Sequence, residues 1–420
     1  MPKLQPIRGT RDILPEERSR FRHIEEVARE LALRYGYLET ATPILEFSEV
    51  FKKTLGETSD VVKKEMYTFT DKGGDEVTLR PEGTAGIARM LISGGLTQDL
   101  PLKFFYQGPM FRYERPQKGR FRQFHQIGVE LLGVPEPLGD IEVIALGSAL
   151  LEKLGIREKT TLHLNTLGTK ISRGKFKTQL ITYLNDFRST LSVESRERIK
   201  VNPLRILDSK DANDKEILAN APRLFDSLDS ESLEFFETVK EGLDHLGISY
   251  QLDSKLVRGL DYYCHTAFEF ITPHLGAQGA VLAGGRYDGL VGQMGGTETA
   301  GIGWAGGIER LSLLTGTNKK YSRTISVIPV VSGLEKEALS LAVHCRAQGL
   351  AIDLGFRGNL SRRLKRASKL NAIAAVIMGP EEMNRGFVIV RNLDTGKQED
   401  VAMTNLIAYL ERYQHGNAGQ

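Results

Sequence analysis

Runs of apolar and polar positions predict alternating helices and strands in the first part of the chain. Residues 15–36 begin with proline and two acids, continue with apolar residues at helical spacing and end at a glycine, which predicts a helix. Residues 37–46 predict a short strand interrupted by Pro43. Because proline has no N–H to donate, that strand belongs at a sheet edge or a bend. Residues 76–84 predict a strand ending in a turn, and residues 84–95 a helix.

Two apolar segments flank a basic loop around residues 111–130, which predicts a β-hairpin. Side chains alternate between the faces of a strand, so the second segment divides into two sets. The core-facing set is His125, Ile127, Val129 and Leu131, and the other set is Phe124, Gln126, Gly128 and Glu130. We expect Gly128 to leave room between the Gln126 and Glu130 side chains, so that this face forms the floor of a small polar site. The alternative is an amphipathic sheet whose polar face is merely solvated.

The pattern then changes twice. Residues 169–246 are polar with helical periodicity, which predicts an inserted helical module. Strand patterns return after residue 247, and residues 315–324 resemble a linker. From about residue 325 the order of predicted elements is βαβαββ, which indicates a separate small α/β domain.

Composition limits the kinds of partner. The chain has 420 residues, 40% hydrophobic and 26% charged, with a net charge of +3. These values fit a globular protein of two or three domains, whose nucleic-acid contacts would come from local patches. The two cysteines are far apart, which argues against disulfides and fits the cytoplasm. We expect no signal peptide, no membrane span and no membrane partner.

One polar cluster and one isolated arginine are candidates for ligand binding. Thr78, Arg80 and Glu82 alternate onto one face of a strand, and the turn aims Glu82 at the strand end, where a carboxylate could bind an ammonium group. The alternative is an ordinary surface turn. Arg258 lies in an apolar context and needs an anionic partner, which is either a ligand or an internal carboxylate such as Asp261.

A tyrosine pair and two glycine-rich segments are further candidates for a binding site. Strand alternation predicts that Tyr262 and Tyr263 face opposite ways. Residues 283–290 combine a predicted Gly-Gly turn with Arg286, Tyr287 and Asp288, and glycine permits close approach of a ligand. Residues 301–306 contain G-x-G-x-x-G but lack the preceding strand and following acid of a dinucleotide site, so we expect a tight strand-to-helix turn that carries Arg310.

The last domain carries a basic run at residues 356–370 without any acid. We interpret it as a surface for a phosphate backbone, with a solvated helix face as the alternative. No Walker A sequence, H-E-x-x-H sequence or His/Cys cluster is present, so the sequence predicts neither a P-loop nor a protein-held metal.

Five sequence motifs together resemble the histidyl-tRNA synthetases, a family of class II aminoacyl-tRNA synthetases, in their bacterial form. Residues 42–51 resemble the dimer-forming first class II signature, and residues 111–114 with Arg120 and Phe124 match the second. Residues 301–311 resemble the third signature. Two segments, LVRGLDYY at 256–263 and AGGRYDGL at 283–290, are similar to the peptides that mark the histidine-specific members.

The resemblance implies a fold and a domain division. It implies an α+β catalytic domain with an antiparallel six-stranded class II synthetase sheet flanked by helices, a helical insertion domain and a C-terminal α/β anticodon-binding domain. The catalytic core would be residues 1–168 and 247–318, the insertion 169–246 and the anticodon-binding domain 325–420. The protein would be a homodimer in the cytoplasm.

The resemblance also implies roles for particular residues. Arg112 and Arg258 would be catalytic. The residues implied to bind L-histidine are Glu82, Gly83, Thr84, Arg112, Gln126, Glu130, Arg258, Tyr262, Tyr263 and Tyr287. Those implied to bind ATP are Arg112, Glu114, Arg120, Phe124 and Arg310. Those implied to bind tRNA are Gln117, Lys118, Arg357, Arg362, Arg363 and Arg366.

The implied reaction has two steps. Histidine reacts with ATP to give histidyl-adenylate and pyrophosphate, and the histidyl group then passes to the 3′-terminal adenosine of tRNA(His). Mg²⁺ would be held chiefly by ATP, and no tightly bound prosthetic group is implied. The alternative is a catalytically silent paralogue, similar to the regulatory subunit of ATP phosphoribosyltransferase. Because the signature residues and the basic domain are present, the sequence favours the enzyme.

Overall fold

The computed structural model describes residues 4–55, 61–117, 119–201, 203–209, 211–256, 262–276, 279–316 and 323–414. The chain divides into two compact units, residues 1–317 and residues 318–420. Each unit has its own hydrophobic clusters. Within the described ranges, every helix is too short or too polar to pass through a lipid bilayer.

An eight-stranded sheet organises the first unit. Its strands in spatial order are β1 (Leu38–Glu39), β5 (Leu102–Phe111), β6 (Gln123–Leu132), β11 (Gly301–Gly307), β10 (Ala280–Arg286), β9 (Cys264–Ile271), β7 (Thr161–Thr166) and β8 (Gln251–Leu252). The six strands from β5 to β7 pair antiparallel. The two-residue strands β1 and β8 are added in parallel at the edges. The predicted antiparallel sheet is therefore confirmed, but the predicted count of six strands is wrong, because two-residue edge strands leave no pattern in a sequence.

One face of this sheet packs against helices α1 (Pro15–Arg34), α4 (Pro137–Lys153), α8 (Ser230–His245) and α10 (Ile308–Leu314). Helix α1 starts with proline and two acids, as its sequence predicted, and buries Phe21, Ile24 and Leu31 on one side. The predicted core face of β6 is confirmed by the buried Ile127 and Val129 in the same cluster.

The other face of the sheet is also covered. It packs against α3 (Thr84–Ser93), α9 (Leu290–Gln293) and α2 (Ser48–Leu55). A small antiparallel sheet of β2 (Leu45–Phe47), β4 (Glu76–Leu79) and β3 (Tyr67–Thr70) belongs to the same unit. The polar face of β6 is therefore inside the protein, and the alternative of a solvated sheet face is wrong.

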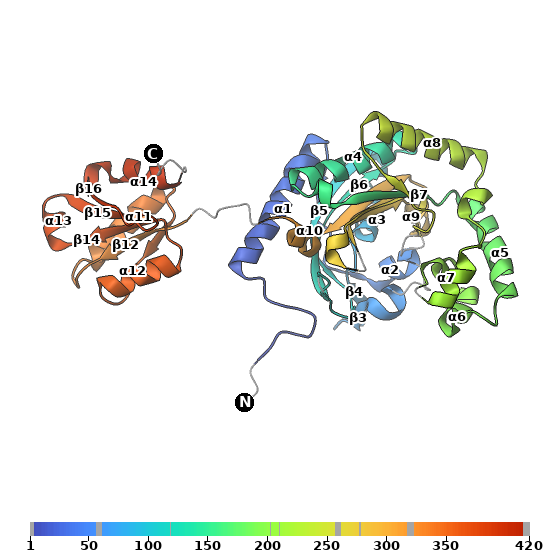
Figure 1. Ribbon diagram of the computed structural model, residues 1–420, viewed down its shortest axis with the longest axis horizontal. Helices are drawn as coiled ribbons and strands as arrows, with labels where there is room; N and C mark the ends of the chain where they lie inside the picture. Colours follow the sequence, from blue (N-terminus) through green and yellow to red (C-terminus); the bar gives the residue numbers. More distant parts are fainter. Residues whose placement is uncertain are drawn as a thin grey trace. The chain divides into compact units, whose positions relative to one another are not determined.

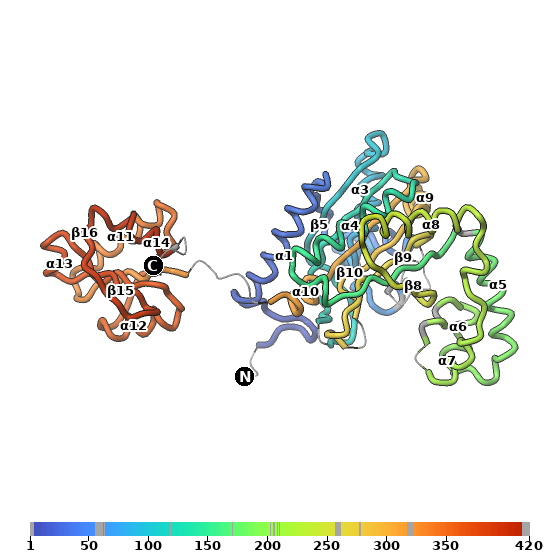
Figure 2. Tube along the Cα trace, turned by 45° about the horizontal axis from the view of Figure 1, so that its top comes forward, coloured from blue at the N-terminus to red at the C-terminus, as the bar shows by residue number. Residues whose placement is uncertain are grey.

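The predicted helical segment consists of α5 (Lys170–Asp186), α6 (Val193–Val201), α7 (Ala212–Leu218) and α8. In both views α5, α6 and α7 group at the side of the unit far from α1, while α8 returns along the sheet (Figures 1 and 2). The buried residues of this three-helix group, such as Phe176, Leu180 and Ile199, belong to the same hydrophobic cluster as α2, α3 and α9. These helices fall within residues 169–246, which we keep as the proposed extent of the insertion.

The second unit is a five-stranded sheet with helices on it. Its elements are β12 (Ile325–Pro329), α11 (Glu335–Ala347), β13 (Ile352–Leu354), α12 (Leu360–Lys369), β14 (Ala374–Met378), α13 (Pro380–Asn384), β15 (Phe387–Asn392), β16 (Gln398–Ala402) and α14 (Leu406–Gln414). The predicted βαβαββ order is confirmed, and the short helices α13 and α14 are additional. Strands β13, β12 and β14 are parallel, and β15 and β16 continue the sheet antiparallel.

Candidate active site

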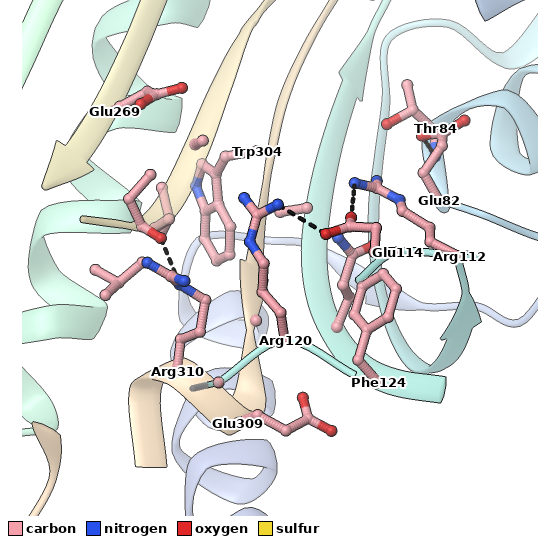
Figure 3. A pocket seen from close by; sticks show the side chains of 18 of the residues that line it. Glu82, Thr84, Arg112, Glu114, Arg120, Phe124, Glu269, Trp304, Glu309 and Arg310 are labelled. Atoms are coloured by element: carbon pink, nitrogen blue, oxygen red, sulfur yellow. Dashed lines mark hydrogen bonds and ion pairs between the residues drawn. The ribbon is translucent and has the colours of Figure 1, made fainter. Parts of the chain in front are cut away.

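A cavity of about 450 Å³ opens on the sheet face that carries Gln126. Its walls come from β6, β9, β10 and β11, from the loop between β5 and β6, and from the first residues of α3 and α10. Figure 3 shows side chains from these separate segments pointing into one space. The hairpin, the strand end at Glu82 and the glycine-rich strand β11, which the sequence analysis treated separately, therefore form one site.

Cations line the end of the cavity near the hairpin loop. Glu114 binds Arg120 at 2.7 Å and lies 3.9 Å from Arg112, so that it holds two guanidinium groups together (Figure 3). The Arg112 Nε donates to the carbonyl oxygen of Pro81 at 2.8 Å, and its guanidinium lies over the Phe124 ring at 5.4 Å. One carboxylate offsets only part of this charge, and planar guanidinium groups suit phosphate oxygens. This end of the cavity is therefore suited to a polyphosphate.

Arg310 adds a further cation from α10. Its Nε donates to the Ala280 carbonyl oxygen at 2.8 Å, and the residue is almost fully buried. Burial lowers the pKa of Arg310, and the positive charge of Arg120 lowers it further. Two neighbouring cations that repel one another are stabilised when an anion binds between them.

Glu82 lies where β4 leads into α3. Its two carboxylate oxygens accept hydrogen bonds from the backbone N–H groups of Thr84 and Ala85, each at 2.8 Å. Burial raises the pKa of Glu82, although these donors favour the charged form. The residue is 5% exposed, so the alternative of a surface turn is wrong. Glu82 therefore caps α3 and presents a carboxylate to the cavity at the same time.

Glu130 lies immediately behind the cavity wall. Its carboxyl accepts a hydrogen bond from the Thr84 hydroxyl at 2.7 Å and another from the Tyr287 hydroxyl. Burial raises the pKa of Glu130 to about 8, and the negative charge of Glu82 contributes to the rise. Gly83 and Tyr287 are buried alongside it. A neutral or charged form of this carboxyl can therefore be selected by what binds in front of it.

The Gln126 side-chain oxygen is buried and has no hydrogen-bond partner among the described residues. An unpaired buried polar atom costs free energy that a ligand donor could recover.

The predicted space beside Gly128 is not available to a ligand, however. The Tyr106 ring occupies it, since a Cβ at position 128 would lie 2.4 Å from the Tyr106 hydroxyl. The predicted polar floor is thus Gln126, Tyr106 and Glu130 together.

Tyr262 and Tyr263 both line the cavity, with ring centroids 4.6 Å apart. The prediction that they face opposite ways is wrong. Alternation applies within a strand, and β9 begins only at Cys264.

The predicted Gly-Gly turn is also wrong. Gly284 and Gly285 lie inside β10, and a Cβ at position 284 would lie 2.2 Å from the Gly303 carbonyl oxygen of the neighbouring strand. Arg286 is fully buried in an ion pair with Asp140, away from the cavity. These glycines therefore serve close strand packing.

Other predicted site residues are Arg258, Lys118 and four arginines of the second unit. Arg258 and Lys118 lie outside the described residues. In the second unit Arg357 and Arg362 are exposed, and Arg366 binds Asp353 at 2.6 Å. Arg363 is buried and donates to the Pro329 carbonyl oxygen. The exposed arginines therefore remain candidates for a phosphate backbone, whereas Arg363 belongs to the interior of the domain.

The sequence analysis gave no role to several side chains that line the cavity, among them Glu65, Phe121, Glu269, Trp304 and Glu309, or to Tyr106 beside Gly128. Tyr106 had a signal, because the hairpin register places it opposite Gly128, where the missing side chain leaves space for an aromatic ring. Trp304 donates its indole N–H to the Val143 carbonyl oxygen at 3.0 Å. Glu269 lies on β9, whose register with β10 could not be read from the sequence.

Comparison with known proteins adds independent information. Residues 9–311 match the sequence profile of histidyl-tRNA synthetase, and residues 324–413 match an anticodon-binding domain. The chain is 56% identical to the histidine–tRNA ligase of Rhodospirillum rubrum over 98% of this chain and 100% of that protein.

Two solved structures have the same fold as this chain. The S. aureus histidyl-tRNA synthetase superimposes with a TM-score of 0.81 at 33% identity, over 97% of this chain and 100% of that one. A Bacillus halodurans protein described as an ATP phosphoribosyltransferase regulatory subunit/histidyl-tRNA synthetase has a TM-score of 0.65 at 24% identity. It covers 89% of this chain and 98% of its own, and its likeness concerns the fold alone.

Proposed function

Since the chain belongs to the histidyl-tRNA synthetase family, we propose that its cavity is the place where histidine and ATP react, with histidine at the inner end and the phosphates at the cationic end. The enzyme is an aminoacyl-tRNA synthetase that activates L-histidine with ATP and then transfers the histidyl group to the 3′-terminal adenosine of tRNA(His). ATP is therefore a substrate and not a resident cofactor.

The inner end fits the amino acid. The Glu82 carboxylate, the Thr84 hydroxyl and the unpaired Gln126 oxygen would hold the α-ammonium group. Tyr263 at the wall and Glu130 behind it would bind the imidazole, with Tyr262 and Tyr287 closing the pocket. A site that pairs both imidazole nitrogens leaves buried groups unpaired with amino acids of other shape, which gives selectivity.

The outer end fits ATP. Arg112 would bind the α-phosphate, Arg310 the γ-phosphate, and Phe124 would stack on adenine, while Glu114 keeps Arg112 and Arg120 in place. The histidine carboxylate attacks the α-phosphorus, and pyrophosphate leaves. Arg112 and Arg258 would neutralise the charge that develops on the phosphorus, and loss of one such donor typically costs about 10²–10³ in rate.

Mg²⁺ would enter with ATP and bridge its phosphates. Among the residues that the structure describes, no three His, Cys, Asp or Glu side chains come together as a metal-binding group. In this proposal the ATP phosphates supply most of the ligands of the ion.

We propose two surfaces for tRNA. The loop around Gln117, beside Arg112 and Arg120, would meet the acceptor end, because it borders the cavity where transfer takes place. Exposed Arg357 and Arg362, with Arg366, would contact the phosphate backbone near the anticodon. Phosphate contacts of this kind position a nucleic acid without reading its sequence.

We also propose a homodimer that works in the cytoplasm, where translation takes place. Phe47 and Phe69 lie opposite the same residue, Val77, on the small sheet, and both are about half exposed. Exposed aromatic side chains gathered on one strand face are typical of a protein interface.

One observation carries the proposal. The cavity joins three guanidinium groups at one end to a buried carboxyl pair, Glu82 and Glu130, at the other. A regulatory paralogue that only senses histidine would need the second group and not the first, so the retained cations favour the enzyme.

The test is amino-acid-dependent exchange between ATP and pyrophosphate, measured without tRNA for all twenty amino acids. We expect exchange with histidine alone, followed by charging of tRNA(His). Histidine binding without exchange would support the regulatory alternative. As an internal check, Arg258→Ala should abolish exchange while histidine still binds by calorimetry, and loss of both would contradict the role proposed for Arg258.

A further inference from the structure

A strained residue lies two positions after Tyr263, the second of the two cavity tyrosines. His265 has a backbone φ of +42°, in the left-handed region. That conformation costs roughly 1–3 kcal/mol for a residue other than glycine, and histidine, asparagine and aspartate tolerate it best. Asn371, in the second unit, is the other non-glycine residue with positive φ in the part of the chain that the structure describes.

The strain coincides with a break in strand pairing. Along the β9–β10 pair, Gly285 lies opposite Ala267, but the next residue of β10, Arg286, lies opposite Cys264. Strand β9 therefore carries two extra residues, His265 and Thr266, which form a β-bulge. Bulges bend a strand and redirect the side chains next to them, and they are frequent beside active sites.

The segment just before the helical insertion and the returning helix α8 both contact this bulge. The His265 N–H donates to the Gly168 carbonyl oxygen at 2.9 Å, and the Leu167 N–H donates to the His265 carbonyl oxygen at 2.6 Å. Leu167 and Gly168 lie where the chain leaves β7 for α5. The His265 ring packs on Phe235 of α8, the returning helix, with ring centroids 4.7 Å apart.

We propose that His265 is a positioning residue for the histidine pocket. Its left-handed backbone turns the chain at the start of β9, and this turn sets where the preceding Tyr262 and Tyr263 lie relative to the cavity. Leu167 and Gly168, which follow β7, and Phe235 of α8 hold the bend in place. The inference rests on the proposed histidine site, and it assigns to His265 no contact with the substrate.

Substitutions that differ only in tolerance of positive φ test the proposal. His265→Val resists this conformation, whereas His265→Asn and His265→Gly accept it. In ATP–pyrophosphate exchange we expect His265→Val to raise the KM for histidine at least tenfold and to leave the KM for ATP within twofold. His265→Asn and His265→Gly should keep the histidine KM within about threefold of the wild type.

Asn371→Val is the matched control, since it places the same residue at the other left-handed position, where φ is +54°. It should lower the melting temperature without changing the KM for histidine. If His265→Val does not fold, His265→Ala is judged by the same criteria.

An unchanged histidine KM in His265→Val, or an equal rise in both KM values, would overturn the proposal. Absence of exchange in the wild type would instead overturn the proposed function.

Discussion

Gly303 faces Glu130 across the β6–β11 pair so closely that a Cβ at position 303 would lie 1.9 Å from Oε2 of Glu130. The Glu130 carboxyl, between Thr84 and Tyr287, therefore occupies the volume that any side chain at 303 would need. The glycine that the sequence placed in a strand-to-helix motif thus determines where the buried carboxyl of the proposed histidine pocket can lie.

Gly303→Ala should therefore displace Glu130 and reduce kcat/KM for histidine in the exchange reaction by roughly 100-fold or more, which corresponds to about 3 kcal/mol. Gly306→Ala in the same strand is the matched control. A Cβ at 306 would have ordinary contacts of 3.4 Å or longer, so this variant should keep kcat/KM within a few fold. If both variants lose kcat/KM equally, alanine anywhere in strand β11 lowers activity, and displacement of Glu130 is not the cause.

Stability should fall with pH because of Glu130. Burial raises the pKa of Glu130 to about 8 in the folded protein, against an ordinary value of 4.5. Between these values the folded state binds a proton that the unfolded state has released, so the free energy of unfolding falls as pH rises. This loss should approach about 1 kcal/mol per pH unit between roughly pH 5 and pH 8.

Glu130→Gln should remove that dependence. Urea unfolding of the wild type and the variant, measured without substrates from pH 5.5 to pH 8.5, isolates the effect, because the other titrating groups are common to both. We expect the variant to gain stability relative to the wild type as pH rises. Parallel pH profiles would contradict the raised pKa.

The N-terminal segment should support the phosphate end of the cavity. The Gly9 carbonyl oxygen accepts from the Arg122 N–H at 2.7 Å, and the Arg122 carbonyl oxygen accepts from the Arg112 N–H at 2.9 Å. Gly9 has a φ of +87°, and a Cβ there would lie 2.7 Å from Arg122 Cγ. Gly9→Ala should therefore shift Arg112 and slow adenylate formation about tenfold, measured by single-turnover kinetics.

Gly74→Ala is the control for Gly9→Ala. Gly74 has a φ of +96° with no atom within 4 Å of a built Cβ, so alanine brings the same backbone strain without the clash. Its adenylation rate should match the wild type. If both variants form the adenylate slowly, backbone strain and not the clash with Arg122 is the cause. If both react at the wild-type rate, the N-terminal segment does not support catalysis.

Charge on the small sheet should prevent dimerisation. Phe47→Glu places a carboxylate among exposed aromatic side chains, and we expect sedimentation velocity to show a shift from dimer to monomer. Leu138→Glu, at an exposed position on α4, should leave the association state unchanged. If the wild type is a monomer, the proposed dimer is excluded. If Phe47→Glu remains a dimer, the interface lies elsewhere on the protein.

Local patterns predicted the elements well, because alternation and helical spacing report directly on burial. The two faces of β6 were predicted residue by residue, and Ile127 and Val129 are fully buried as expected. The prediction failed where the pattern stops, since Tyr262 and Tyr263 precede β9 and do not follow its alternation. A two-residue bulge at the start of that strand has no signature in a single sequence.

Contacts between distant residues were not predictable from one sequence. Arg286 seemed available for a ligand, but its partner Asp140 lies 146 residues away. The burial of Arg363 did have a local signal, because it shares one helical face with Leu360, Leu364 and Ala367. The basic composition of residues 356–370 concealed that apolar stripe.

Exposure changes along the cavity, and this has a consequence for the order in which products leave. Glu130 at the inner end is 1% exposed, whereas the side chains of Arg112 and Arg120 at the outer end are 23% and 36% exposed. With the substrates placed as proposed, pyrophosphate forms beside the exit, while the activated amino acid stays anchored by its own side chain in the closed end. In this proposal the cavity keeps the reactive mixed anhydride, histidyl-adenylate, from bulk water until the tRNA terminus arrives.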